Sequence, residues 1–287
     1  MDQFEIGGVS AFGGPETEPL TIANFDPGSF DIRKQETDLP RGDGVLVGSE
    51  YLGGGLWSFD LNAHGSTRAE VLAAAGELQR VWNDPARRVA GAMSVLRYQI
   101  DGRWRRVYGR PGRFAAPRPD YAAQAGIGSF GCDFRITRPA FYDDVEQQDV
   151  VGIVPATGGG FTVPFTSPIA TAQSSAPRAG MLINRGDAQT PVTIRFFGPI
   201  AWPLVKSTLG WEVGLSATLA YDDEVVVDPI AGTVMKNGLP APGLLSRRSR
   251  IRRALLQPGA NSLYFTGTDP TGTAKVLLSW RNAYSSL

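Results

Sequence analysis

The chain of 287 residues has very little of two residue types on which many active sites depend, cysteine and histidine. Its single cysteine, Cys132, cannot form a disulfide within the chain, so stability must come from packing or assembly, and we expect a buried thiol. Its single histidine, His64, has no second ligand nearby in the sequence. Zinc sites and histidine-based triads need several positioned groups. We therefore expect His64 to be a helix-start or loop residue, and we predict no metal site, no cofactor and no catalytic residue.

Long apolar runs are missing too. No run approaches the length of a membrane-spanning helix, so we expect no membrane insertion. The first residues, Met1–Ile6, are acidic where a secretory signal would be basic, and they contain no apolar core. We expect the protein to be made and assembled in a cytoplasm.

An excess of charge of either sign is also absent, because 28 Lys and Arg residues balance 28 Asp and Glu residues. No global field draws the chain to nucleic acid or anionic lipid, so we predict no sequence-specific nucleic-acid binding and a partner chosen by shape. Lysine is scarce, and it occurs only at Lys34, Lys206, Lys236 and Lys275. The arginine bias can reflect a GC-rich genome, and it also suits planar, hydrogen-bonded interface contacts.

Glycine and proline, in contrast, are abundant, with 35 and 21 residues. Together with 42% hydrophobic and 20% charged residues, they indicate a soluble, β-rich globular protein. The length exceeds that of a usual single core. We predict an N-terminal domain over 1–145 and a C-terminal domain over 146–287, with a Gly/Ser/Pro-rich connecting region at about 150–180.

The N-terminal domain contains the clearest helix signal of the chain. Thr67 and Glu70 have the spacing of a capping box, and apolar residues then recur at helical spacing until Pro85. This pattern predicts a helix over about 67–83, with one side packed on a sheet.

Strands and loops are predicted around this helix. A hairpin is expected over about 95–108, because Asp101-Gly102 favours a two-residue turn between strand-forming runs. Consecutive glycines within Tyr51–Leu56 predict a flexible or bulged stretch.

The C-terminal domain alternates short β-branched or aromatic runs with turn residues such as Asn237-Gly238, the signature of an antiparallel sandwich or barrel. An edge strand over Phe161–Phe165 is expected within the connecting region. The other predicted strands are Ala179–Ile183, Val192–Phe197, Trp211–Ala220, Glu224–Asp228, Gly232–Lys236, Asn261–Thr266 and Thr273–Trp280.

Two acidic clusters, Asp143-Asp144 and Asp222-Asp223-Glu224, are the remaining candidates for chemistry. They could bind calcium or supply paired carboxylates for sugar hydrolysis. The alternating oxygen ligands of a calcium loop are missing, so we expect solvated turns.

One segment, Arg247–Arg253, is strongly basic. It could contact phosphate or an acidic partner surface, or it could be a subunit contact or a solvated face. The last two readings are favoured, because no aromatic residues are interleaved to stack on bases.

An ordered set of short motifs resembles the C-terminal domain of phage distal tail (Dit) proteins. The set comprises Asn184-Arg-Gly-Asp-Ala-Gln-Thr-Pro191 followed by a strand ending at Gly198, a strand, turn and strand over Leu215–Val227, Thr233-Val-Met-Lys-Asn-Gly238, Leu256-Gln-Pro-Gly-Ala-Asn261 and Trp280-Arg-Asn-Ala-Tyr284. The order of the N-terminal strands, helix and hairpin is similar to that of the ring-forming domain of this family.

The resemblance implies a structural protein of the virion, located at the distal end of the tail and without enzymatic activity. In the family the N-terminal domains form a ring, usually a hexamer, around a channel for DNA, and the C-terminal domain is a galectin-like β-sandwich. The implied partners are further copies of the chain, the tail tube protein, the tape measure protein and the tail-tip or receptor-binding proteins. Candidate ring contacts are Trp57-Ser-Phe59, the Trp104 hairpin and the glycine-rich loops, although such aromatics also suit a core.

Two other functions stay open. The sandwich could bind a carbohydrate on the faces of Trp202 or Trp211, as an adhesion protein would. A glycan hydrolase could use Asp223 or Glu224.

Overall fold

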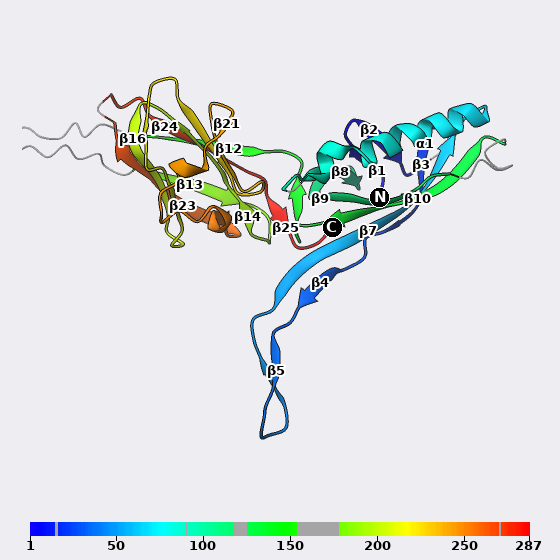
Figure 1. The fold of residues 1–287 in the computed structure, drawn as a ribbon, viewed down its shortest axis with the longest axis horizontal. Helices are drawn as coiled ribbons and strands as arrows, with labels where there is room; N and C mark the ends of the chain where they lie inside the picture. Colours follow the sequence, from blue (N-terminus) through cyan, green and yellow to red (C-terminus); the bar gives the residue numbers. More distant parts are fainter. Residues whose placement is uncertain (15–16, 90, 118–124, 154–177, 270) are drawn as a thin grey trace, which may run out of the picture. The chain divides into compact units, whose positions relative to one another are not determined.

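The computed structural model describes residues 1–14, 17–89, 91–117, 125–153, 178–269 and 271–287. Within them the chain is mainly β with one α-helix, which confirms the predicted fold class at this level. It divides into two compact units, unit 1 with Met1–Asp144 and Ser285–Leu287, and unit 2 with Val145–Tyr284 (Figure 1). The described helix is too short to cross a membrane. The edge strand expected at Phe161–Phe165 lies outside the described residues.

Unit 1 is built on a β-sheet that closes on itself. Its strands are β1 (Gln3–Ile6), β2 (Val9–Phe12), β3 (Leu20–Asp26), β7 (Tyr51–His64), β8 (Ser94–Ile100), β9 (Arg103–Ala115), β10 (Ile127–Ile136) and β11 (Phe141–Asp143). The pairing order is β10-β7-β3-β2-β1-β8-β9, and β9 pairs again with β10 to complete a barrel, with β11 beside β9. Closure removes the open edges of a sheet.

Aromatic side chains fill the barrel. Trp57 and Phe59 of β7 are both 1% exposed. The ring centroids of Phe4 and Phe59 lie 4.7 Å apart, and those of Trp57 and Tyr98 lie 5.1 Å apart. The sequence left open whether the Trp57-Ser-Phe59 strand contacts another subunit or belongs to the core, and in this structure its two aromatic rings belong to the core.

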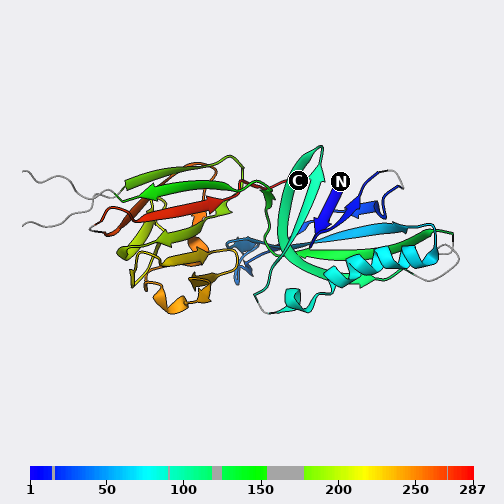
Figure 2. The ribbon, with the colours of Figure 1, turned by 90° about the horizontal axis from the view of Figure 1, so that it is seen from above.

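Helix α1 (Arg68–Trp82) lies along this barrel and packs on β7 and β10 (Figure 2). At its N-cap, Thr67 Oγ1 accepts a hydrogen bond from the Glu70 N–H at 3.3 Å, and the Glu70 carboxylate accepts one from the Ser66 N–H at 2.7 Å. A short 3₁₀ helix, η1 (Pro85–Arg88), follows. The buried face of α1 consists of Val71, Ala75, Leu78 and Trp82. Its period of three to four residues follows from helix geometry.

The Asx-Gly pairs at 101–102 and 237–238 both form tight turns. Asp101 and Gly102 join β8 to β9 with φ of 50° and 73°, and Asn237 and Gly238 join strands of unit 2 with φ of 48° and 80°. Positive φ at both central residues is what a type I′ turn requires.

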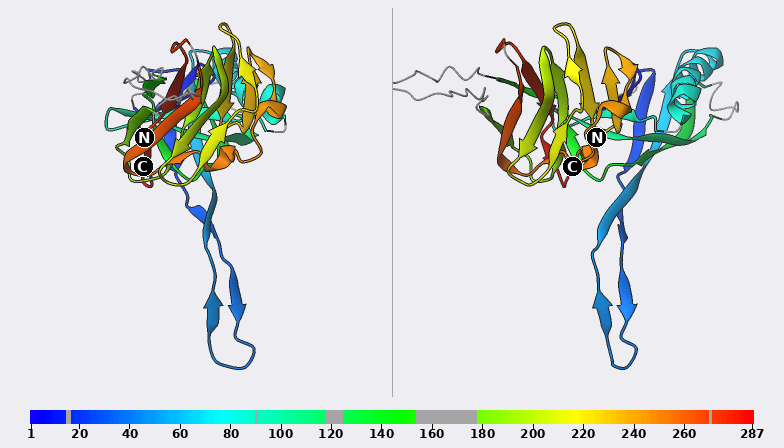
Figure 3. Two further views of the ribbon diagram at one scale, coloured as in Figure 1. Left: turned by 90° about the vertical axis from the view of Figure 1, so that its left-hand side faces the viewer. Right: turned by 60° about the vertical axis from the view of Figure 1, so that its left-hand side comes forward.

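A long β-hairpin extends from the barrel of unit 1 (Figures 1 and 3). It contains β4 (Phe30–Arg33) and β5 (Glu36–Asp38) on one side, and β6 (Val45–Val47) and the first residues of β7 on the other. β4 pairs with β7, and β5 pairs with β6. We call residues 29–56 the arm.

Unit 2 contains two larger antiparallel sheets. One has the order β12 (Gln147–Gly152), β24 (Lys275–Trp280), β15 (Thr193–Phe197), β19 (Glu224–Asp228), β20 (Thr233–Lys236) and β21 (Leu239–Pro240). The other has β13 (Arg178–Asn184), β23 (Gly259–Thr268), β16 (Ile200–Ser207) and β17 (Glu212–Gly214), with β18 (Thr218–Leu219) also beside β16. Smaller elements are β14 (Thr190–Pro191), β22 (Leu255–Leu256), β25 (Ala283–Tyr284), η2 (Pro242–Leu244) and η3 (Ile251–Arg253).

Both sheets of unit 2 contribute to a single hydrophobic core. The rings of Phe196, from the first sheet, and Phe265, from the second, have centroids 6.2 Å apart. The unit is therefore a β-sandwich in its packing. The ends of the predicted connecting region belong to this sandwich, because residues 150–152 lie in β12 and residues 178–180 lie in β13.

Strand β16 is absent from the sequence prediction, which also joined β17 and β18 into one strand over Trp211–Ala220. Two prolines, Pro199 and Pro203, argue against a strand in this segment. The structure accommodates Pro203 at an irregularity between Ala201 and Leu204, where the pairing of β16 with β23 shifts register.

Two of the motifs that carry the family resemblance are turns of unit 2 held by a buried asparagine. Asn184 is 0% exposed, and its amide bonds the Ala188 carbonyl at 2.7 Å and the Gly186 N–H at 3.1 Å. A Cβ on Gly186 would lie 1.8 Å from the Ala283 oxygen, so only glycine fits. Asn261, in the Pro-Gly-x-Asn turn, likewise accepts the Gln257 N–H at 2.8 Å.

Candidate assembly interface

Consecutive glycines stand where the arm leaves the barrel. A Cβ on Gly54 would lie 2.5 Å from the Ile136 oxygen of β10, and one on Gly55 would lie 2.9 Å from the Phe30 ring. The pairing of β4 with β7 is offset between Phe30 and Ile32, as in a bulge that bends a hairpin. The expected flexible or bulged stretch at Tyr51–Leu56 is thus part of a strand, and its glycines permit close approach of neighbouring groups.

Large apolar side chains of the arm face solvent. Leu46 is 65% exposed and Val47 is 68% exposed. Further exposed apolar residues of the arm are Ile32, Leu39, Val45, Tyr51, Leu52 and Leu56. At the tip only three residue pairs join β5 to β6, beginning with Glu36 opposite Val47.

Few packing contacts stabilise the arm in an isolated protomer. A two-stranded hairpin is marginally stable by itself, because it has no second layer against which to bury its side chains. Exposed apolar groups and open strand edges are typical of surfaces that a partner covers. The arm is therefore the strongest candidate for an assembly surface among the described residues.

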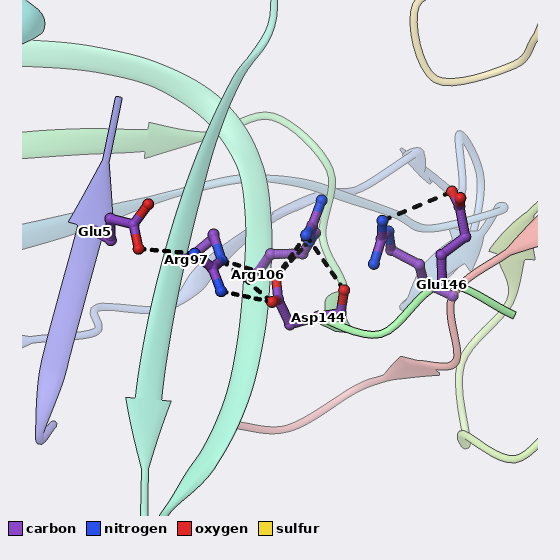
Figure 4. Close-up of polar contacts among 6 residues, drawn as sticks. Glu5, Arg97, Arg106, Asp144 and Glu146 are labelled. Carbon is purple, nitrogen blue, oxygen red and sulfur yellow. Dashed lines mark hydrogen bonds and ion pairs between the residues drawn. The ribbon is translucent and has the colours of Figure 1, made fainter. Parts of the chain in front are cut away.

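A network of ion pairs joins strands β1, β8 and β9 of the sheet in unit 1 (Figure 4). Glu5 of β1, Arg97 of β8 and Arg106 of β9 lie opposite one another in the strand register. Arg97 Nη1 lies 2.7 Å from Glu5 Oε2, and Arg97 Nη2 lies 2.8 Å from Asp144 Oδ2. Arg106 Nε also donates to Asp144 Oδ1 at 3.0 Å. The network ties three strands to the last residue of this segment of unit 1.

The charges of this network are mutually stabilised. Burial by itself would raise the pKa of Asp144, but hydrogen bonds from Arg97 and Arg106 outweigh burial and hold the pKa below its usual range. The hydrogen bond to Asp144 also raises the pKa of Arg97. Asp144 is therefore a structural anion, and its guanidinium partners occupy the oxygens that a calcium ion would need.

The second acidic cluster is also occupied by structural contacts. Asp223 accepts the Ala220 N–H at 2.8 Å and pairs with Lys236 Nζ at 2.9 Å. The hydrogen bond from Lys236 is the main reason why the pKa of Asp223 is lowered. Glu224 pairs with Arg195 at 3.0 Å. In the described ranges, no three His, Cys, Asp or Glu residues form a group suited to a metal ion.

The expected position of His64 is wrong. The residue ends strand β7, where it lies opposite Ile127, and its Nε2 is 2.7 Å from Thr21 Oγ1. The capping signal at Thr67 led to the expectation that the residues just before it lie in a loop or at the helix start. Strand β7 instead continues as far as His64. Cys132 is 1% exposed, and burial raises the pKa of its thiol, so its expected role as a small buried group is confirmed.

The candidate tryptophans differ in accessibility. Trp211 is 7% exposed and its Nε1 donates to the Leu255 carbonyl at 2.9 Å, so it cannot present a ring face to a sugar. Trp202 is 65% exposed and has φ of 49°, a conformation rare for a bulky residue. Trp104 is half-buried, and the Arg97 guanidinium lies 4.9 Å from its ring centroid.

No protein-family model matches the chain, and no curated protein matches it in sequence. Solved structures do match. The Dit protein of phage SPP1, described as a paradigm of the hub adsorption apparatus in phages that infect Gram-positive bacteria, aligns with a TM-score of 0.59 and 15% identity over 96% of this chain and 97% of that one. Baseplate structures of phage p2 in the activated conformation, with calcium and with strontium, align with TM-scores of 0.54 and 0.56 at 11% and 10% identity. The predicted resemblance to distal tail proteins is thereby confirmed as a shared fold over nearly the full length.

Proposed function

We propose that the protein is a structural hub of the distal tail type, located at the distal end of the tail of a long-tailed phage. The observation that carries the proposal is the fold shared with the Dit protein of phage SPP1, because it covers 96% of the chain and therefore includes both units. A match to one β-sandwich alone would say little about function. A hub of this kind needs rigid, symmetric surfaces and no catalytic residue or cofactor.

In this proposal the N-terminal domain, residues 1–145, forms a ring, usually a hexamer in such hubs, around a channel for DNA. A closed ring uses heterologous contacts, in which one face of a protomer meets a different face of the next. The arm supports this arrangement, because its apolar side chains can be buried only by another protein surface. The closed barrel supplies the rigid base from which the arm extends.

The C-terminal domain, residues 146–287, is proposed as a galectin-like β-sandwich carried on the outside of the ring. The proposed partners of the whole protein are the tail tube protein, the tape measure protein and the tail-tip or receptor-binding proteins. Its packing as two sheets around one core supports this part of the proposal.

The ring is tested by light scattering and negative-stain imaging of the purified protein over a range of concentrations. Wild type is expected to form rings. The variant L46D/V47D places two charges on the exposed arm and should give monomers with an unchanged circular dichroism spectrum, because buried unpaired charges oppose association.

The matched control is L209D/L239D, which adds the same charges at exposed leucines of unit 2. It should still form rings. A wild-type protein that stays monomeric at every concentration, or an arm variant that assembles normally, would contradict the proposed role of unit 1.

A second candidate function, carbohydrate binding by the sandwich, is favoured by one observation, the 65% exposed ring of Trp202. Sugars stack on such apolar aromatic faces. A glycan array should then show saturable binding by wild type that Trp202→Ala abolishes and Trp211→Phe, at a buried position, retains. An array without binding would remove this candidate.

A further inference from the structure

A loop of unit 2 carries five arginines within seven residues of sequence. Arg247, Arg248, Arg250, Arg252 and Arg253 are all exposed. The sequence contains no Asp or Glu between Asp228 and Asp269, so no acidic neighbour along the chain compensates these charges. We call residues 246–253 the arginine loop.

The arginine loop is held in one shape. Ser249 Oγ accepts the Gly214 N–H and donates to the Gly214 carbonyl, both at 2.9 Å, and it lies 2.8 Å from Ser246 Oγ. The Ser246 N–H also donates to the Gly214 carbonyl at 2.9 Å. Ile251, at the start of η3, packs against the core of the sandwich. Five like charges are therefore displayed on a backbone that is fastened to strand β17.

Several other cations of unit 2 are paired with carboxylates. Lys236 pairs with Asp223 at 2.9 Å, Arg195 pairs with Glu224 at 3.0 Å, and Arg281 pairs with Glu146 at 3.6 Å. Across the described ranges, no arginine of the loop forms an ion pair with a carboxylate. Like charges held close together repel, so this arrangement favours the binding of an anion.

The apolar residues in the arginine loop and next to it along the chain pack inward, and Leu209, which lines a small pocket with Arg253, is a single apolar side chain that is 49% exposed. Leu244, Leu245 and Ile251 pack on the core, and Ala254 and Leu256 are fully buried. A protein partner usually needs apolar or aromatic anchors at the centre of its interface. No aromatic residue lies within the arginine loop, and Trp211, which lines a small pocket with Arg253, is only 7% exposed, so stacking with unpaired bases is not offered either. What the surface offers is charge and guanidinium hydrogen bonds.

We propose that the arginine loop is a binding site for a flexible, linear phosphate polymer that is not a nucleic acid. Guanidinium groups donate paired hydrogen bonds to phosphate oxygens, and several of them close together along the chain can bind successive phosphates of one polymer. Binding of such a polymer releases its condensed counterions, so the affinity depends steeply on salt. The site needs no oligomer and is independent of the proposed ring.

The test measures binding of full-length protein to medium-chain inorganic polyphosphate by fluorescence anisotropy over a salt series. R247Q/R248Q and R252Q/R253Q should each weaken binding by about tenfold or more at low salt, and should lower the slope of log affinity against log salt by about two. These side chains are exposed, so both variants should fold.

The matched control is R185Q/R195Q, which removes the same charge from exposed positions of unit 2 outside the loop. Its affinity should stay within about twofold of wild type if the loop and not net charge binds the polymer. Equal loss in the control and the loop variants would overturn the proposal.

Two further probes separate the sources of negative charge. Poly-glutamate of matched charge should bind at least about tenfold more weakly than polyphosphate. The reason is that phosphate and carboxylate differ in charge density and in the arrangement of their oxygens, and we expect the guanidinium groups of the loop to prefer phosphate. Equal binding of poly-glutamate would identify an acidic protein surface as the partner instead. Tighter binding of duplex DNA than of polyphosphate at equal phosphate concentration would identify nucleic acid and overturn the proposal as stated.

Discussion

The arm and the arginine loop are both exposed, but they are exposed in opposite ways. The arm presents apolar side chains, such as Leu46 and Val47, on a hairpin whose tip has few cross-strand pairs. The arginine loop presents charges on a backbone that Ser249 and Ile251 fasten to a folded sandwich. The arm leaves apolar side chains exposed unless a partner buries them, whereas the arginine loop already has its folded shape before a ligand binds.

This difference indicates two modes of recognition. Apolar surface on a weakly supported element gains stability mainly by burial, so the arm should become ordered and stable together with its partner. A preorganised charged loop loses little conformational entropy on binding, and its affinity is governed by salt. Measurements on single protomers can separate the two.

The largest expected contrast lies within one strand, β7. Trp57→Ala removes a side chain that is 1% exposed in the barrel and should lower the free energy of unfolding by about 3–5 kcal/mol. Leu52→Ala, at a position of the same strand that is 54% exposed in the arm, should change it by less than about 0.5 kcal/mol. Both changes in the free energy of unfolding are measured by urea unfolding in the L46D/V47D background, which is expected to be monomeric.

If Leu52→Ala cost as much as a core substitution, the arm would have to be packed already in the protomer, and the comparison with the arginine loop would fail. If the proposed ring forms through the arm, the same substitution should weaken association, because the ring would bury the side chain.

The sequence was sufficient for elements whose signals are local. The capping residues Thr67 and Glu70 identify the start of α1, and Asp101-Gly102 identifies the turn of the β8–β9 hairpin. Each signal depends on a few neighbouring residues and their own backbone preferences.

Features that depend on non-local contacts could not be predicted from the sequence. Closure of the barrel depends on pairing of β9 with β10, and no local pattern shows that the first residues of β7 extend beyond the barrel as part of the arm. Strand β16 was missed because Pro203 is tolerated only at the irregularity that the partner strands create. The exposure of Trp202 and the burial of Trp211 also depend on tertiary packing, since both are aromatic residues beside strand signals.

A smaller effect is expected where charge is compensated, at Asp144. Asp144→Asn should lower the free energy of unfolding by about 1–2 kcal/mol at neutral pH, since Arg97 and Arg106 lose their partner while solvent still screens part of the network. The folded-state pKa of Asp144 is depressed, so the carboxylate stabilises the fold above the unfolded pKa of about 3.9 and this contribution is lost as the pH falls through the folded pKa.

Urea unfolding between neutral pH and about pH 3 tests this expectation, because the difference between wild type and variant should shrink below about pH 4. Asp43→Asn, on the exposed arm, is the control and should leave stability unchanged at every pH. A constant difference across the range would mean that the amide variant disturbs packing and not an ion pair.

The smallest expected effect concerns the fastening of the arginine loop. Ser249→Ala leaves the buried Gly214 N–H without its side-chain acceptor and should lower the free energy of unfolding by about 1 kcal/mol. Because the five arginines remain, the salt slope of polyphosphate binding should not change, while the affinity should fall by about threefold through lost preorganisation. Ser216→Ala, at an exposed neighbour on the chain, should change neither quantity.

An altered salt slope in Ser249→Ala would show that the arginine loop makes different contacts with the polymer once it is released from β17. Unchanged affinity would show that the hydrogen bonds of Ser249 do not matter for binding. The distinction between the arginine loop and the arm would then be lost.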